Sequence, residues 1–250
     1  MSRIPPNLRI NADDFGLSAA LSRAIAQAAR DGLVNSISVV PFHDDESLRL
    51  LEALAARPDV RVGAHLTFIE VPLLTRPARY PDGRPPATYR QFLTAYLGGK
   101  VSARDVAVEW AAQLDLLGSR LGRKPIDHLD GHQHLHLLPA LWRVARGLQR
   151  DYHVPVLRCP RERSLRAWLK DFPMGAGLQA LALSRPGPVE ERFFGVGTSM
   201  GFRAAAYAAE ADLVRSHPER AYELMVHPGE DARGQRELEE LARWLERLQG

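Results

Sequence analysis

The sequence predicts an α/β fold in which six or seven βα units form a closed or slightly broken barrel. An open doubly wound sheet is the alternative. The chain has 250 residues, a length at which α/β barrels commonly form one domain. Along it, short apolar runs alternate with helical patterns, an order typical of βα units and a mostly parallel sheet. No Gly-x-Gly-x-x-Gly or P-loop pattern occurs, so a nucleotide site has no support.

The first third of the chain holds three predicted strands and two helices. In chain order these elements are strand Leu8–Asn11, helix Ala19–Arg30, strand Ser36–Val40, a helix from Asp44 or Asp45 through Ala56, and strand Val60–His65. Ser18 is a typical helix N-cap, and Gly32 follows the first helix at a position where helices end. Pro41 stops the second strand, because proline cannot donate to a sheet ladder.

Residues 70–100 change character, since five prolines and three glycines fall among them. This composition predicts an irregular insertion with a functional role. Beyond it, Ser102-x-x-Asp105 resembles a capping box that opens a helix. Residues 159–200 are ambiguous apart from a weak strand near Phe193–Val196. The remaining predicted elements are helix 102–121, strand Ile126–Asp130, helix Leu138–Asp151, strand Val154–Arg158, helix Phe202–Ser216, strand Tyr222–Val226 and helix Asp231–Leu248.

The composition excludes several classes of protein. Cys159 is the single cysteine, which excludes an internal disulfide framework and a cysteine-built zinc site. A net charge of +3 without a Lys/Arg block argues against nucleic acid as a partner. The sequence has no apolar run of the roughly 18–20 residues that a transmembrane helix needs, and no signal-peptide pattern. We therefore expect one domain over residues 1–250, in the cytoplasm, without a transmembrane segment.

Two motifs follow predicted strands near the start of the chain. Asn11-Ala-Asp13-Asp14-Phe-Gly comes after the first strand, and its adjacent carboxylates repel each other unless a cation, an arginine or solvent compensates. A turn or a helix cap is the simpler explanation of this run. His65 ends the third strand, where a lone histidine is usually a core residue bonded to the backbone.

The segment 127–136 is the most specific signal, because four of the nine histidines and two aspartates fall within it. If the segment is extended, alternation places Asp130, His132, His134 and His136 on one side. Imidazole and carboxylate are normal ligands of Zn, Fe, Ni or Mn. A polar loop with locally bonded histidines is the alternative to a metal site.

His227 ends the last predicted strand and is followed by Pro and Gly, which expose its imidazole. A buried structural histidine is the alternative. All four motifs, together with Arg158, lie at predicted carboxyl ends of strands, where catalytic groups of (β/α) barrels gather. Independent turns or core histidines have no reason to favour one end of the sheet.

An Asp-His-His set leaves open positions on a metal, where a bound water becomes more acidic and a substrate oxygen is polarised. A second carboxylate can then act as general base, and a separate histidine can protonate the leaving group. These parts suit hydrolysis of an amide or an ester.

Taken together, the Asn-Ala-Asp-Asp-Phe-Gly run, His65, Asp130-Gly-His-Gln-His-Leu-His136 and Met225-Val-His-Pro resemble the YdjC-type carbohydrate deacetylases. That family includes chitooligosaccharide deacetylase and the hopanoid-biosynthesis deacetylase. The resemblance covers residues 8–248. It implies a single distorted (β/α) barrel of about seven strands, related to polysaccharide deacetylases. It also implies a metal-dependent hydrolase that removes an N-acetyl group from a sugar or glycoconjugate.

The resemblance assigns roles to six side chains: metal ligands Asp14, His65 and His132, general base Asp13, general acid His227, and Arg158 to orient the catalytic Asp. It leaves Asp130 to orient a histidine, with His134 and His136 nearby but not ligands. One divalent ion is implied, with Mg or Zn as first choices and Ni, Co or Mn also fitting. The expected partner is an N-acetylated sugar, oligosaccharide or glycolipid, and a homodimer is the base-rate assembly.

Two rival functions stay open. Another metallohydrolase, of amidohydrolase or phosphohydrolase type, would use the same ligands, although amidohydrolases usually place His-x-His after the first strand, where this chain has Asp13 and Asp14. A non-catalytic sugar- or metal-binding barrel would need neither Asp13 nor His227.

Overall fold

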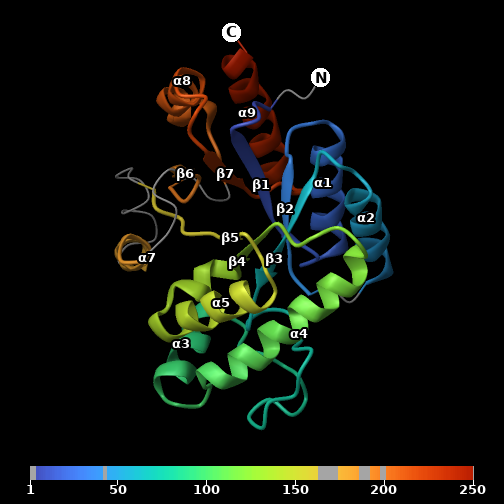
Figure 1. Cartoon of the computed structure of the whole chain (residues 1–250), viewed down its shortest axis with the longest axis vertical. Coiled ribbons are helices and arrows are strands. Elements are labelled where there is room, and N and C mark those ends of the chain that lie inside the picture. Colours follow the sequence, from blue (N-terminus) through green and yellow to red (C-terminus); the bar gives the residue numbers. More distant parts are fainter. Residues whose placement is uncertain (1–3, 42–43, 163–173, 186–191, 198–200, 250) are drawn as a thin grey trace.

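Seven parallel strands form one sheet in the order β5-β4-β3-β2-β1-β7-β6 (Figure 1). The computed structural model describes residues 4–41, 44–162, 174–185, 192–197 and 201–249. The strands are β1 (Leu8–Phe15), β2 (Ser36–Val39), β3 (Arg61–Leu66), β4 (His128–Gly131), β5 (Val156–Leu157), β6 (Arg192–Phe194) and β7 (Tyr222–Val226).

The strand order is that of a circle opened between β5 and β6. β1 pairs with β2 on one side and with β7 on the other, and within the described residues no ladder joins β5 to β6. The sheet is therefore a curled half-barrel. The predicted distorted (β/α) barrel of about seven strands is confirmed, and the structure is not the open doubly wound sheet that was the alternative.

The strands alternate between apolar and polar residues, and this alternation gives the sheet two different faces. In β1, Leu8, Ile10 and Ala12 belong to the main hydrophobic core, whereas the buried residues that follow each of them are the polar Arg9, Asn11 and Asp13. The same alternation puts further polar side chains or glycine on the second face: Ser36 and Ser38, Gly63 and His65, His128 and Asp130, and Glu223. Helices thus cover the apolar face, and a buried polar interior lines the other.

The helices surround the sheet, with α1 packed on α2, α2 on α4, α4 on α5, and α8 on α9 (Figure 1). They are α1 (Ala19–Arg30), α2 (Asp45–Ala55), α3 (Tyr89–Leu97), α4 (Ala103–Leu121), α5 (Pro139–Asp151), α7 (Met174–Leu183), α8 (Ala208–Ser216) and α9 (Ala232–Gln249), with the short 3-10 helices η1 (His132–Leu137) and η2 (Ala204–Tyr207). Ser18 caps α1, and the capping box at Ser102 opens α4, as predicted. None of the described helices is long and apolar enough to cross a membrane.

Three predicted segments differ from the structure. β1 runs four residues past Asn11, so both aspartates lie within the strand rather than after it. The insertion at 70–100 is not irregular throughout, because Thr88 caps α3 and Phe92 is buried against the core. The ambiguous stretch 159–200 contains α7 and β6, and its residues 163–173, 186–191 and 198–200 lie outside the described part of the chain.

Candidate metal and catalytic centre

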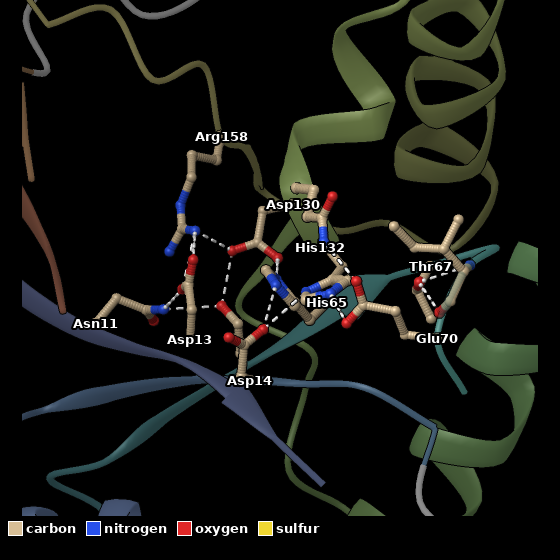
Figure 2. Close-up of polar contacts among 12 residues, drawn as sticks. Asn11, Asp13, Asp14, His65, Thr67, Glu70, Asp130, His132 and Arg158 are labelled. Carbon is tan, nitrogen blue, oxygen red and sulfur yellow. Dashed lines mark hydrogen bonds and ion pairs between the residues drawn. The ribbon is translucent and has the colours of Figure 1, made fainter. Parts of the chain in front are cut away.

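Asp13 and Asp14 lie side by side near the end of β1, yet both carboxylates point into the polar interior (Figure 2). In a regular strand, neighbouring side chains point to opposite faces. Here the β1–β2 register shifts between Ala12 and Phe15, and Asp14 has a left-handed backbone with φ of 71°. Such a backbone costs about 1–3 kcal/mol in a non-glycine residue and is concentrated at functional sites. The irregularity therefore re-aims the second carboxylate towards the same site as the first.

Asp14, His65 and His132 meet in one cluster (Figure 2). Asp14 Oδ1 lies 3.2 Å from Nε2 of His65 and 2.8 Å from Nδ1 of His132. One donor atom from each residue lies within 4.8 Å of the other two, a spacing that suits one metal ion. The side chain of Asp14 is 17% exposed, so this cluster is reachable from solvent.

The charges in this cluster hold one another in their ionised forms. Burial would raise the pKa of Asp14, but hydrogen bonds from His132 and His65 hold it well below its usual range. Burial would lower the pKa of His132, but hydrogen bonds to Asp14 and Glu70 raise it to about 9. A divalent cation bound here would displace one proton from each imidazole, and two neutral imidazoles with an ionised carboxylate make a donor set suited to it.

Asp130 supports His65 from the neighbouring strand. The two residues are partners in the β3–β4 ladder, and His65 Nδ1 lies 2.6 Å from Asp130 Oδ1. The other oxygen of Asp130 accepts from Ser38 Oγ at 2.7 Å and lies 2.6 Å from Arg158 Nη1. Because one imidazole nitrogen faces Asp130, the other is left facing Asp14. This is the contact expected of a residue that orients a histidine.

A second group of donor atoms, from Asp13, His65 and Asp130, also lies within 4.8 Å. All three side chains are buried, and Arg158 already binds both carboxylates. A guanidinium in that position disfavours a second cation there. The Asp14–His65–His132 cluster is the better candidate metal site.

Arg158 is the central cation of the polar interior, and its side chain is only 1% exposed. Its Nη1 donates to both oxygens of Asp13 at 2.9 and 2.8 Å, and its Nε donates to Glu223 at 2.6 Å. Burial would lower its pKa, but Asp13, Asp130 and Glu223 raise it well above the usual value. Asn11 also donates to Asp13 Oδ1 at 2.6 Å. Asp13 is therefore held beside the candidate metal cluster without belonging to it.

The histidine-rich segment does not stay extended, so the prediction that Asp130 and three histidines share one side is wrong. β4 ends at Gly131, and Gln133 and His134 adopt left-handed φ values of 47° and 58°. Only His132 reaches Asp14. His136 turns inward, where its Nε2 lies 3.0 Å from the carbonyl oxygen of Arg158, and burial lowers its pKa to about 4. His134 Nδ1 is buried without a hydrogen-bond partner among the described residues.

His128 takes part in the polar interior rather than in the metal cluster. Its Nε2 lies 2.9 Å from Ser38 Oγ, and its ring sits directly against Gly63. A Cβ at Gly63 would come within 2.2 Å of that nitrogen, so only glycine leaves room for the ring.

His227 follows β7, whose last residue, Val226, pairs with Ala12 of β1. The parallel register therefore places His227 and Asp13 at the same level of adjacent strands. The backbone N–H of His227 donates to Glu237 at 2.6 Å. In the described part of the chain its Nδ1 is buried without a partner, and no hydrogen bond links its ring to the metal cluster.

Sequence reasoning missed Glu70, which lies in the loop after β3. Glu70 Oε2 lies 3.1 Å from Nε2 of His132, and its Oε1 accepts from Gln133 at 2.5 Å (Figure 2). Asn11, Ser38 and Glu223 were given no role either, although the alternation of polar residues in β1, β2 and β7 could have revealed one. No sequence signal marks Glu70 itself, although it is the first residue of the insertion at 70–100 for which a functional role is predicted.

Comparison with known proteins gives one family. The model of the YdjC-like protein family matches residues 7–247. A carbohydrate deacetylase from Homo sapiens is 29% identical over 92% of this chain and 76% of that protein. A chitooligosaccharide deacetylase from Klebsiella pneumoniae is 25% identical over 88% and 81%. A carbohydrate deacetylase from Vibrio parahaemolyticus is 30% identical, but the match spans only 58% of this chain and 56% of that relative.

A solved structure from Enterococcus faecalis V583, described as that of a proposed cellobiose-phosphate cleavage protein, shares the fold. Its TM-score is 0.61 with 24% sequence identity, over 97% of this chain and 90% of that one. The two proteins therefore share a fold over nearly the whole chain, and the likeness says nothing about their chemistry.

Proposed function

The chain belongs to the family of YdjC-like proteins, and from this premise we propose that it is a metal-dependent hydrolase that removes an N-acetyl group from an N-acetylated sugar or glycoconjugate. The observation that carries the proposal is that two adjacent carboxylates have different partners. Asp14 lies with His65 and His132 in the candidate metal cluster, whereas the adjacent Asp13 is bound by Arg158. Relatives named carbohydrate deacetylase and chitooligosaccharide deacetylase support the substrate class.

The donor set fits one divalent ion held by Asp14, His65 and His132. Two imidazoles with one carboxylate favour Zn²⁺ over Mg²⁺, because magnesium prefers oxygen donors. Such an ion would supply a more acidic water and polarise the acetyl carbonyl.

The two proton transfers of the hydrolysis would be carried out by side chains of the protein. Asp13 would take the proton of the attacking water at a carboxylate oxygen, and Arg158 with Asn11 would keep that carboxylate in place. His227, at the same level of the neighbouring strand, would give a proton to the amine nitrogen as the C–N bond breaks. Acetate and the free amino sugar would result. The substrate would be a sugar, an oligosaccharide or a glycolipid that carries the N-acetyl group.

Asp13→Asn tests whether Asp13 is the general base and not a metal ligand, because asparagine keeps the size of the side chain and loses its basicity. We expect acetate release from N-acetylglucosamine oligomers to fall about 10²–10⁴-fold, the usual contribution of a general base. Zn²⁺ affinity should stay at the wild-type level. Asp82→Asn, which changes an exposed loop carboxylate, is the control and should alter neither quantity.

An Asp13→Asn variant that releases acetate at the wild-type rate would refute the general-base role. If the wild-type protein binds metal yet releases acetate from no N-acetylated sugar, a non-catalytic binding protein or another metallohydrolase is the better explanation.

A further inference from the structure

We propose that Glu70 is a positioning residue for His132: its carboxylate holds Nε2 of the imidazole and thereby keeps Nδ1 aimed at the candidate metal site. This inference rests on the proposed function, because it assigns a support to one of the proposed ligands. It concerns a loop residue that neither the sequence pattern nor the alternation of the strands singles out.

The two histidines of the cluster have matching surroundings. His65 places Nδ1 on Asp130 at 2.6 Å and Nε2 towards Asp14 at 3.2 Å. His132 places Nε2 on Glu70 at 3.1 Å and Nδ1 towards Asp14 at 2.8 Å (Figure 2). Each ring therefore has one nitrogen on a supporting carboxylate and the other on the shared carboxylate of Asp14.

This arrangement has a chemical consequence for metal binding. A neutral imidazole that offers one nitrogen to a metal carries its proton on the other. A carboxylate that accepts this proton in a hydrogen bond fixes the tautomer, orients the ring and makes the ligating nitrogen more basic. Asp130 is placed to do this for His65, and Glu70 for His132.

Glu70 is not placed as a ligand itself. The groups of candidate ligand atoms found in the described residues contain Asp14, His65 and His132 or Asp13, His65 and Asp130, and neither includes Glu70. Its two oxygens are used otherwise, one by His132 and the other by Gln133.

The loop that carries Glu70 is built to hold it. Glu70 has a left-handed φ of 68°, a conformation that persists only where neighbouring contacts impose it. Its backbone N–H donates to Pro86 O at 3.2 Å. Three residues earlier, the carbonyl of Thr67 accepts from Trp110 at 3.1 Å and Gln113 at 2.8 Å, both on α4.

The other side of the loop is fixed by the buried Glu109 of α4. Its carboxylate accepts from the backbone N–H of Leu74 at 3.0 Å and from that of Thr75 at 2.8 Å. Anchors on both sides therefore leave Glu70 little freedom to leave His132. A loop residue without a role would need neither the strained backbone nor these buried anchors.

The test compares Zn²⁺ binding by the metal-free full-length protein and two variants, Glu70→Gln and Asp82→Asn, in competition with a coloured chelator. Both substitutions remove one negative charge from the same insertion, but Asp82 is exposed and pairs only with Arg84 among the described residues. We expect Glu70→Gln to weaken Zn²⁺ binding about tenfold and Asp82→Asn to leave it unchanged. Glu70→Ala, which also removes the acceptor oxygen, should lose up to about 100-fold.

Thermal unfolding in excess chelator separates positioning from folding. We expect the metal-free Glu70 variants to unfold at the wild-type temperature, because Glu70 is partly exposed and its loop is anchored elsewhere. Zn²⁺ affinity of Glu70→Gln equal to that of the wild type would overturn the inference while leaving the proposed metal site intact. A wild-type protein that binds neither Zn²⁺ nor any other of the proposed divalent ions would instead overturn the proposed function, and the role of Glu70 with it.

Discussion

The two halves of the candidate metal cluster are supported in different ways. His65 lies on the strand side, and its partner Asp130 is 0% exposed and bound by Ser38 and Arg158. His132 lies on the loop side, where its partner Glu70 is 30% exposed. The strand side takes its geometry from sheet register and buried charge, whereas the loop side depends on left-handed turns and on anchors from α4. We infer that damage to the strand side costs folding as well as binding, and that damage to the loop side costs binding alone.

The largest expected effect is on the strand side, at Arg158. Arg158→Met would leave Asp13, Asp130 and Glu223 buried without their shared cation, and losing one partner of a buried ionic network costs about 3–5 kcal/mol. The free energy of unfolding, measured in urea on the metal-free protein, should fall by that amount.

Arg23→Met is the matched control, because Arg23 also bridges two carboxylates, Glu46 and Glu230, but is 44% exposed. Exposed ion pairs contribute little to stability, because water and salt screen them, so Arg23→Met should change the free energy of unfolding far less. Equal losses in the two variants would show that the buried network does not stabilise the strand side in the way we describe.

A smaller effect is expected from Asp130→Asn, which removes the charge that supports His65. Zn²⁺ affinity should fall about 10–100-fold, as when the carboxylate partner of a ligating histidine is changed. Unlike Glu70→Gln, this variant should also lower the free energy of unfolding of the metal-free protein, because the buried Arg158 loses one of its counter-charges. If Asp130→Asn unfolds like the wild type in chelator, the proposed contrast between the two halves is wrong.

The strand side was largely predictable from the sequence. Short apolar runs between helical patterns located the strands, and β7 occupies its predicted bounds. The parallel order then brought Asp14, His65 and Arg158 to one end of the sheet. What could not be predicted was the irregularity at Asp14, since a left-handed aspartate leaves no mark in the sequence.

The loop side was less predictable, because its turns use residues that rarely adopt left-handed backbones. The sequence predicted an extended segment over 130–136, but left-handed backbones at Gln133 and His134 kink the chain and separate His136 from His132. Glu70 contacts His132 although 62 positions separate them in the sequence. The loop that carries Glu70 is held by side chains of α4, a long-range contact that sequence patterns do not reveal. The helix α3 did have a signal in Thr88-x-x-Gln91, which the surrounding prolines obscured.

The most direct test of the proposed function is acetate release by chelator-treated protein, before and after Zn²⁺ or Mg²⁺ is added back, from N-acetylglucosamine oligomers and N-acetylglucosaminyl lipids. We expect metal-free protein to release no acetate above background, and one added divalent ion to restore release from at least one of these substrates. Full activity in protein shown to contain no metal would contradict the proposed metal dependence.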